Sequence, residues 1–454
     1  MKTYPVEVLA QALSGQIQQG DAATLVTGGV STDTRSVLQG ALFFALRGEN
    51  FDGHDFLGKA AKLGATALVV EREMDFPEGV AVIKTDDVLV ALQKLAAWYR
   101  RELDIPVVAI TGSNGKTSTK DLTRAVLAQR FQVNATKGNL NNHIGLPLTV
   151  LATEEDDEVL ILEMGMSHAG ELAPLCEIAR ADLGIITSVG TAHIEHLGSR
   201  GAIAEEKGTL ARSLGEKGTL LMPHDCDFTL IFKSESKART LTVGNGGAEI
   251  RAEKIVFDEA GCCFDLLIDG LGMAEVSLAV TGRHMVDNAL LAAGAGFVLG
   301  LSVDEIANGL ASMQLTAGRL RRFSSKGINV IDDTYNANPD SVLAAINTLA
   351  DLPAEEMAKK FLVLGHMAEL GEYGEFEHAR VGSRAAERNL QVVAVGSEAR
   401  GIAEAAGEGA QFFEEKWAPA EWLEKAMKKD DIVLFKGSRS AAMEDVMKQI
   451  FPEN

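Results

Sequence analysis

Residues 105–128, IPVVAITGSNGKTSTKDLTRAVLA, decide how the middle of this chain folds. The stretch opens with the apolar run VVAI (107–110), which is typical of a short strand buried on both faces of a parallel sheet. A glycine-containing loop follows at 112–116, and the residues after the loop favour a helix. We therefore expect a strand, a tight loop and a helix in direct succession.

The loop has the composition of a phosphate-binding loop. Its GKT (115–117) matches the end of the G-x-x-x-x-G-K-[ST] pattern, although Gly112 stands three residues before the second glycine rather than five. The glycines let backbone N–H groups converge on phosphate oxygens, while Lys116 can reach the β- and γ-phosphates and Thr117 can bind Mg²⁺. The expected ligand is ATP. A glycine-rich turn with a solvated lysine is the alternative, and the flanking strand and helix favour the phosphate loop.

Size and composition indicate a globular protein of several domains. At about 100–200 residues per domain, 454 residues suggest two to four domains, and we expect three. No apolar run reaches about 18 residues, and the N-terminus lacks the apolar core of a signal peptide. We therefore expect a cytoplasmic protein without membrane insertion. The four cysteines show no C-x-x-C spacing, so they indicate neither a zinc site nor disulfides.

The net charge of −21 argues against a nucleic-acid binder, since such proteins need Lys and Arg to neutralise phosphates. Any anionic ligand must therefore be met locally. Helix N-termini, glycine loops and a few well-placed arginines can do this.

Alternating apolar runs and helical patterns divide the chain into three α/β domains, at 1–103, 104–318 and 319–454. The first is a compact module with a polar stretch at 31–56, for which a pair of solvated loops is the simplest account. The second is the parallel-sheet domain of the phosphate loop, with short strands at 215–280 that suit a small antiparallel insertion or edge. In the third, INVIDD, FLVLG, QVVAVG and DIVLFKG each precede a helical pattern, which predicts a second doubly wound sheet. No G-x-G-x-x-G follows a strand there, so a dinucleotide site is not expected.

Polar side chains follow two predicted strands of the central domain. Glu163 ends the strand VLILEM, and His193 follows the strand GIITSVG. Ligands of an open parallel sheet sit at the carboxyl ends of its strands. A lone Glu or His is most often structural, but their position beside the phosphate loop favours a metal or phosphate role.

Several motifs of this chain resemble those of a known family. TGSNGKTST (111–119) resembles the shortened phosphate loop of the Mur ligases of peptidoglycan synthesis and their folylpolyglutamate synthetase relatives, and the resemblance spans essentially the whole chain. GNLNNHIGLPLT (138–149), DDTYNANPDS (332–341) and GHMAELG (365–371) resemble the members that add D-alanyl-D-alanine. The resemblance implies an N-terminal UDP-binding module, a P-loop ATPase-like centre and a Rossmann-like C-terminal domain that binds the dipeptide and closes on ATP.

Carried over by position, the resemblance implies a set of site residues. The implied catalytic residues are Lys116, His193 and Lys207. The implied ATP-binding residues are Gly112, Ser113, Asn114, Gly115, Lys116, Thr117, Ser118, Asn288, Arg319 and Asp333. The implied metal ligands are Thr117, Glu163, His193 and Lys207, the last as a carbamate. The implied substrate-binding residues are Ser31, Thr34, Arg35 and Arg47 for UDP, with Asn139 and Asn141, and Asn336 and Asn338 for the dipeptide.

The carbamate at Lys207 follows from its interval to His193, which is the interval that relatives use for a carbamate-bearing lysine. A solvated helix lysine paired with Glu205 or Glu206 is the alternative. A carbamate would turn a cation into an anionic oxygen ligand suited to Mg²⁺.

The implied activity is ATP-dependent amide formation between a UDP-N-acetylmuramoyl-tripeptide and D-alanyl-D-alanine, by a monomer that uses Mg²⁺. Two alternatives stay open. A P-loop regulatory ATPase would need no sugar-nucleotide module, and a related Mur ligase or folylpolyglutamate synthetase would share the core but join different substrates.

Overall fold

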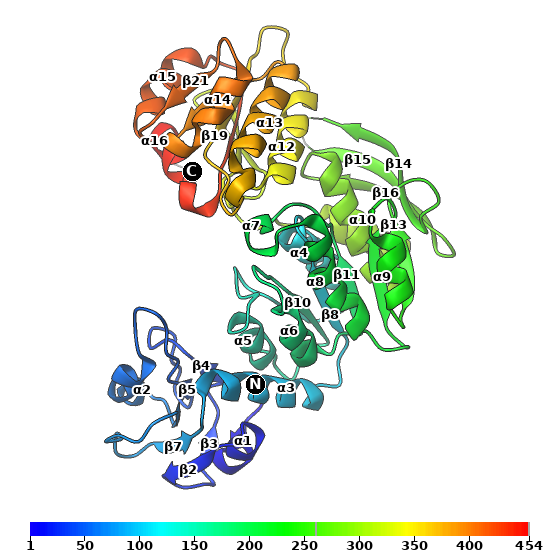
Figure 1. Ribbon diagram of the computed structural model, residues 1–454. Helices are drawn as coiled ribbons and strands as arrows, with labels where there is room; N and C mark the ends of the chain where they lie inside the picture. The colour runs from blue at the N-terminus through cyan, green and yellow to red at the C-terminus, as the bar shows by residue number, and fades with distance from the viewer. Residues whose placement is uncertain (259–260, 453–454) are drawn as a thin grey trace.

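The computed structural model describes residues 1–258 and 261–452. Figure 1 shows three bodies that follow one another along the chain and curve into an open C. Each body is built on a sheet, and the largest apolar core cluster contains residues from all three. The predicted three-domain α/β fold is confirmed, while the exact division at 103/104 and 318/319 stays a prediction.

The first domain holds a five-stranded sheet in the order β2-β7-β6-β5-β4, in which β2 alone pairs antiparallel. Its strands are β2 (Gln16–Gln19), β4 (Val30–Ser31), β5 (Leu42–Phe44), β6 (Ala67–Val70) and β7 (Ala81–Lys84), beside the separate pair β1 (Tyr4–Pro5) and β3 (Leu25–Val26). Its helices are α1 (Val6–Ala12), η1 (Gly53–Phe56), α2 (Leu57–Lys62) and α3 (Val88–Glu102). The predicted strands at 41–46 and 65–70 are thus present in shorter form.

Helix α3 attaches this domain to the central one. Asp87 caps its N-terminus by accepting a hydrogen bond from the Val90 amide. The Tyr99 hydroxyl donates to the Thr153 carbonyl over 2.8 Å, and Arg100 Nε donates to the Ala179 carbonyl over 2.8 Å. Because these groups are buried, the bonds fix the helix against α5 and α6, on which it lies in Figure 1.

The central domain holds a nine-stranded sheet in the order β16-β15-β14-β13-β12-β11-β8-β10-β9. Its strands are β8 (Val107–Thr111), β9 (Val133–Ala135), β10 (Val159–Glu163), β11 (Leu183–Ile186), β12 (Thr219–Pro223), β13 (Arg239–Val243), β14 (Ile250–Phe257), β15 (Cys262–Ile268) and β16 (Gly272–Leu278). Its helices are α4 (Lys116–Leu127), α5 (Gly145–Leu151), α6 (Leu172–Ala179), α7 (Ile194–Leu197), α8 (Arg200–Ser213), α9 (Thr229–Glu235), α10 (Arg283–Val298) and α11 (Val303–Ala311).

Strand β8 is fully buried between the parallel strands β10 and β11, as its apolar sequence predicts. The antiparallel edge is also present, but it is confined to β14, β15 and β16. The prediction is wrong for β12 and β13, which continue the parallel sheet because helices α8 and α9 supply the crossovers.

The C-terminal domain holds a six-stranded sheet in the order β17-β18-β22-β19-β20-β21. Its strands are β17 (Arg321–Ser325), β18 (Ile328–Asp333), β19 (Lys360–Leu364), β20 (Gln391–Val395), β21 (Gln411–Phe413) and β22 (Ile432–Lys436). Its helices are α12 (Pro339–Asp351), η2 (Gly371–Tyr373), α13 (Gly374–Glu387), η3 (Ser397–Ala399), α14 (Arg400–Ala406), α15 (Ala418–Ala426), η4 (Arg439–Ala441) and α16 (Met443–Ile450). The four predicted strands are the four inner ones, and the unpredicted β17 and β21 form the edges.

Among the described residues, no helix combines the length and apolar character needed to cross a membrane.

Candidate active site

Residues 105–128 form the expected strand, loop and helix, with β8 running into the loop and α4 starting at Lys116. Gly115 has φ 82°, in the left-handed region, and a Cβ there would lie 2.5 Å from Asn288 Oδ1. Glycine is therefore required both for the turn and for the close approach of α10. The same approach places Asn288 at the loop, where Thr119 Oγ1 donates to its Oδ1 over 3.2 Å.

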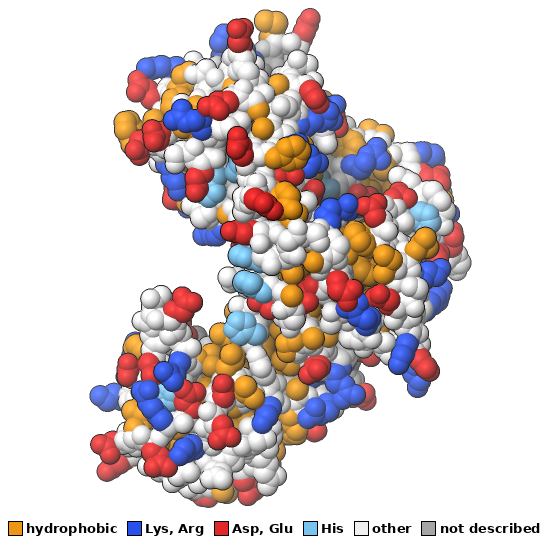
Figure 2. Space-filling model, viewed as in Figure 1, with side chains coloured by type: hydrophobic (Ala, Val, Ile, Leu, Met, Phe, Trp, Pro, Cys, Tyr) orange, Lys and Arg blue, Asp and Glu red, His pale blue; other side chains and the backbone are white. Residues whose placement is uncertain are grey.

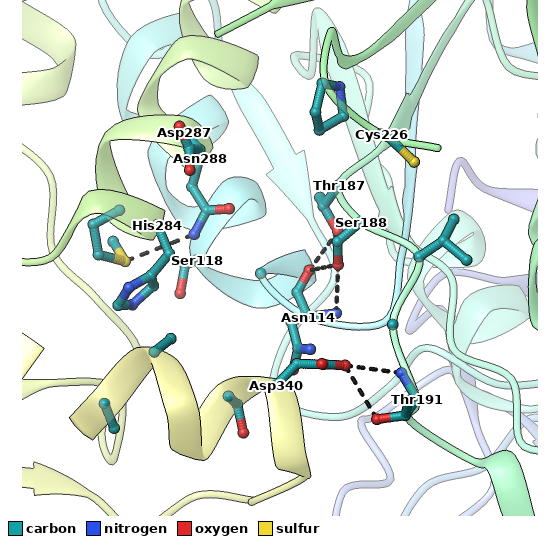
Figure 3. A pocket seen from close by; sticks show the side chains of 18 of the residues that line it. Asn114, Ser118, Thr187, Ser188, Thr191, Cys226, His284, Asp287, Asn288 and Asp340 are labelled. Atoms are coloured by element: carbon teal, nitrogen blue, oxygen red, sulfur yellow. Dashed lines mark hydrogen bonds between the residues drawn. The ribbon is translucent and has the colours of Figure 1, made fainter. Parts of the chain in front are cut away.

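The segment after β11 holds the phosphate loop from the side (Figure 3). Thr187 Oγ1 donates to the Asn114 carbonyl over 2.5 Å, and the Asn114 amide donates to Ser188 Oγ over 2.9 Å. The Gly190 amide donates to Ser113 Oγ over 2.9 Å. These bonds fix the loop before any ligand binds, which is the preorganisation that phosphate binding requires.

Two lysines lie close together under the loop. Lys116 Nζ donates to the Gly112 carbonyl over 2.7 Å, and burial lowers the pKa of Lys116. Lys207 on α8 is only 1% exposed, and its burial, with Lys116 nearby, holds the pKa of its amine well below the ordinary value. The alternative of a solvated Lys207 is therefore wrong. Of its two acidic neighbours in sequence, Glu205 pairs with Arg212. Glu206 accepts hydrogen bonds from the amides of Gly170 and Leu172, and its charge offsets part of the lowering of the Lys207 pKa.

Glu163, at the end of β10, is a buried carboxylate beside the loop. Its Oε1 accepts from Asn141 Nδ2 over 2.8 Å and from Thr117 Oγ1 over 3.3 Å. Its Oε2 is buried and makes no hydrogen bond within the described part of the chain, and Lys120 Nζ lies 3.9 Å away. A buried carboxylate oxygen without a hydrogen-bond partner is suited to binding a cation.

His193 lies at the start of α7 with φ 65°, a rare conformation for a residue with a side chain. Its Nδ1 lies 2.5 Å from Glu369 Oε2 of the C-terminal domain, and this contact lowers the pKa of Glu369. No group of three or more His, Cys, Asp or Glu side chains in the described residues is arranged to hold a metal. Of the four predicted metal ligands, only Glu163 and His193 are of these types, and Thr117 and Lys207 are not.

Two cavities meet at the phosphate loop, of about 750 and 710 Å³. Asn114, Gly115, Thr191 and Arg319 line both. The first cavity also contains Ser118, Asn288 and Asp333, and the second contains Ser113, Lys116, Thr117, Asn139, Asn141, Glu163, His193, Asn336 and Asn338. Most of the predicted ATP, metal and dipeptide residues thus lie around one loop. Gly112 lies behind it, where a Cβ would meet Thr187 Oγ1 at 1.9 Å.

The C-terminal domain closes one side of these cavities. Asp333 is paired with the buried Lys436 over 2.6 Å, and Asn338 Nδ2 donates to Asn114 Oδ1 of the phosphate loop over 2.8 Å. Arg319, in the linker, lies 4.2 Å over the Tyr335 ring and its Nη2 donates to Thr117 Oγ1 over 3.5 Å.

The residues predicted to bind UDP lie apart from this centre. Ser31, Thr34, Arg35 and Arg47 belong to the first domain and line neither cavity. Ser31 Oγ donates to the Asp33 carbonyl, Arg35 pairs with Asp33, and Arg47 pairs with Glu71. Figure 2 shows an open notch between the first domain and the rest of the molecule, with histidines along its inner wall.

Sequence reasoning missed several residues of the site. Thr187 and Ser188 come directly after β11, and the rule that polar groups at strand ends face the ligand could have found them. Lys436 ends β22 in the same way. His284 carried no such signal; it lines the first cavity, and burial lowers its pKa to about 4, so its ring is neutral at pH 7.

Comparison with known proteins gives one consistent result. Models of the Mur ligase family match residues 27–100 (catalytic domain), 110–296 (middle domain) and 318–439 (glutamate ligase domain). The chain is 37% identical to the UDP-N-acetylmuramoyl-tripeptide--D-alanyl-D-alanine ligase of Bacillus subtilis over 98% of both chains, and 35% identical to that of Escherichia coli over 99% of both.

Solved structures agree. A crystal structure of MurF from Acinetobacter baumannii matches with a TM-score of 0.90 at 31% identity over 100% of both chains. A MurF ligase from Thermotoga maritima in complex with ADP matches with a TM-score of 0.85 at 30% identity, covering 94% of this chain and 98% of that one. The match to a Mycobacterium tuberculosis folylpolyglutamate synthase, at 18% identity and a TM-score of 0.63, extends to the fold alone. With its full-length relatives, its three domains and its shortened phosphate loop, this chain belongs to the Mur ligase family.

Proposed function

We propose that this protein is an ATP-dependent ligase that joins D-alanyl-D-alanine to the terminal carboxylate of a UDP-N-acetylmuramoyl-tripeptide in peptidoglycan synthesis. The observation that carries the proposal is that one phosphate loop borders two cavities. A regulatory ATPase needs only a nucleotide cavity, whereas a ligase must present the γ-phosphate to a second substrate. Because ATP and a nucleotide-linked precursor are its substrates, we assign the reaction to the cytoplasm. We further propose that the protein acts as a monomer.

ATP fits the first cavity. Asn288, Arg319 and Asp333 line this cavity and would surround the nucleotide. Asn114, Gly115 and Ser118 of the phosphate loop line it as well, so the phosphates would extend over that loop. Backbone N–H groups at the start of α4 face the phosphates, and the helix dipole favours their negative charge. The two peptide substrates fit the second cavity, where Asn139 and Asn141 from one side and Asn336 and Asn338 from the other offer amide groups.

The reaction proceeds in two steps. An oxygen of the tripeptide carboxylate attacks the γ-phosphorus and ADP leaves, which gives an acyl phosphate. The amine of D-alanyl-D-alanine then attacks the carbonyl carbon, loses a proton and expels phosphate. Lys116 stabilises charge on the transferring group, and positioning by the two cavity walls supplies much of the remaining acceleration.

Residues at the loop fit a magnesium ion. The buried Glu163 Oε2 and the Thr117 hydroxyl are oxygen ligands of the hard type that Mg²⁺ prefers. When bound, Mg²⁺ would neutralise phosphate charge. Lys207, as a carbamate, and His193 complete the proposed set. Glu369 holds Nδ1 of His193, which leaves Nε2 as the nitrogen that would contact the metal.

The first domain holds the UDP moiety. In a chain of net charge −21, Arg35 and Arg47 are exposed cations in the polar loops at 31–56, which suits a pyrophosphate. Thr34 adds a hydroxyl group in the same loops, and Ser31, the buried last residue of β4, adds another. Since the first domain borders the open notch of Figure 2, we propose that substrate binding and domain closure go together.

Lys116→Ala is expected to lower ligation by about 100-fold or more, because it removes the cation that faces the γ-phosphate. Turnover is measured as phosphate release that depends on D-alanyl-D-alanine, beside thermal unfolding. Arg124→Ala, an exposed change on the same helix, is the control. A Lys116→Ala protein with the parent's stability and near-normal turnover would rule out the phosphate-loop assignment.

Lys207→Ala is expected to lose activity that added bicarbonate or short carboxylic acids partly restore, because a small anion can fill the carbamate's place. Carbamate formation needs a neutral amine, and burial of Lys207 lowers its pKa and so supplies one. Carbon-13 NMR with labelled bicarbonate gives a direct signal, which Lys207→Ala should lack and the exposed Lys233→Ala should keep. A fully active Lys207→Ala enzyme would refute the carbamate.

Arg35→Ala and Arg47→Ala are each expected to weaken binding of the UDP-linked tripeptide roughly tenfold, by loss of a charge-assisted contact of about 1.4 kcal/mol. Affinity for an ATP analogue should not change, since these residues lie in another domain. Calorimetry measures both, with Arg101→Ala as the exposed control. Unchanged affinity in both variants counts against this assignment.

A further inference from the structure

The C-terminal domain contacts the central domain through the first turn of α12. Asp340 Oδ2 accepts a hydrogen bond from the Thr191 amide over 2.8 Å and another from Thr191 Oγ1 over 3.2 Å. Figure 3 shows this pair at the edge of the first cavity, beside Asn114. One carboxylate oxygen thus joins two domains, through residues that are 149 positions apart in the sequence.

Helix α12 does not need Asp340 as its cap. Asn338 is the N-cap, and it forms a capping box with Ser341, in which each side chain bonds the other residue's backbone. An acidic residue in a first helical turn is also favoured by the helix dipole, typically by 0.3–1 kcal/mol. That effect alone would leave the side chain facing solvent, whereas Asp340 Oδ2 is directed at both donors of Thr191.

Gly190 lies directly against Asp340. A Cβ on Gly190 would lie 2.1 Å from Asp340 Oδ2, although the backbone there is not in the left-handed region. The absence of a side chain is therefore explained by the close approach of Asp340 rather than by the backbone conformation.

The segment that Asp340 holds is also joined to the phosphate loop. At its start, Thr187 and Ser188 bind the backbone of Asn114, and Gly190 binds Ser113. Further along, Thr191 lines both cavities. The segment 187–191 therefore connects the phosphate loop on one side to α12 on the other.

We propose that Asp340 is a positioning residue for ligation, which seats the C-terminal domain on the phosphate-loop domain through Thr191. It acts by fixing how far Asp333, Asn336 and Lys436 stand from the loop. Asp340 lies in the wall of the first cavity, where its Oδ2 accepts both hydrogen bonds from Thr191. This inference rests on the proposed ligase function for its kinetic consequence, while the contact itself is testable without any substrate.

The first measurement is hydrogen exchange of the substrate-free, full-length protein. Asp340→Ala removes the acceptor of the Thr191 amide, so peptides covering 188–193 should exchange at least tenfold faster than in the parent. Asp351→Ala is the matched control, because Asp351 lies on the same helix but pairs with Arg388 inside the C-terminal domain. It should leave exchange at 188–193 unchanged.

The second measurement separates positioning from binding. Asp340→Ala should lower kcat at least tenfold, while the dissociation constant of the UDP-linked tripeptide, measured without ATP, stays within twofold of the parent's. Asp340→Asn keeps an acceptor oxygen and should recover part of the lost kcat. A general loss of stability would not give this split or this recovery.

Gly190→Ala perturbs the same contact from the central domain. It replaces Asp340→Ala as the test variant if that protein fails to fold. Its added methyl group should displace Asp340, accelerate exchange at 188–193 and lower kcat. In the Gly190→Ala, Asp340→Ala double variant the clash is gone, so kcat should be no lower than in Asp340→Ala alone. Independent, multiplying losses would contradict a shared contact.

The proposal is overturned if Asp340→Ala exchanges at 188–193 like the parent, or if it exchanges faster yet keeps kcat within twofold. If the parent itself fails to ligate, the proposed function falls, while the exchange result still decides whether Asp340 holds Thr191.

Discussion

Two anions must meet in a protein that is itself strongly anionic. The γ-phosphate of ATP and a peptide carboxylate repel each other, and the chain carries a net charge of −21. A few basic side chains near the phosphate loop can offset this repulsion. Lys116 and Arg319 line the second cavity, and Lys436 lines the first. The buried Glu163 adds a negative charge beside the loop, and Lys120 Nζ lies 3.9 Å from its Oε2.

The loop is fixed from three directions. The segment after β11 bonds Ser113 and Asn114, α10 brings Asn288 over Gly115, and the C-terminal domain reaches Asn114 through Asn338. His193 and Glu369 make a further contact between the same two domains. The first domain stands apart from the C-terminal domain across the notch in Figure 2, while the buried hydrogen bonds of α3 attach it to the central domain.

Much of this arrangement could be predicted from the sequence, and the reasons for success and failure are physical. VVAI (107–110) and FLVLG were recognisable as strands because both of their faces are buried. The edge strands β17 and β21 could not be recognised in this way. β17 is partly exposed and mostly polar, and β21 has only three residues. Glu163 and His193 were found from strand ends, but Asp340 and Glu369 were not, because contacts between domains leave no periodic pattern in the sequence.

In the proposed reaction the tripeptide carboxylate is phosphorylated before the amide forms. The most direct test supplies a UDP-N-acetylmuramoyl-tripeptide labelled with oxygen-18 in its terminal carboxylate, together with ATP and D-alanyl-D-alanine, and analyses the products by mass spectrometry. Each turnover is expected to transfer one labelled oxygen into the released phosphate and to yield ADP. Unlabelled phosphate, or label recovered in AMP, would contradict it.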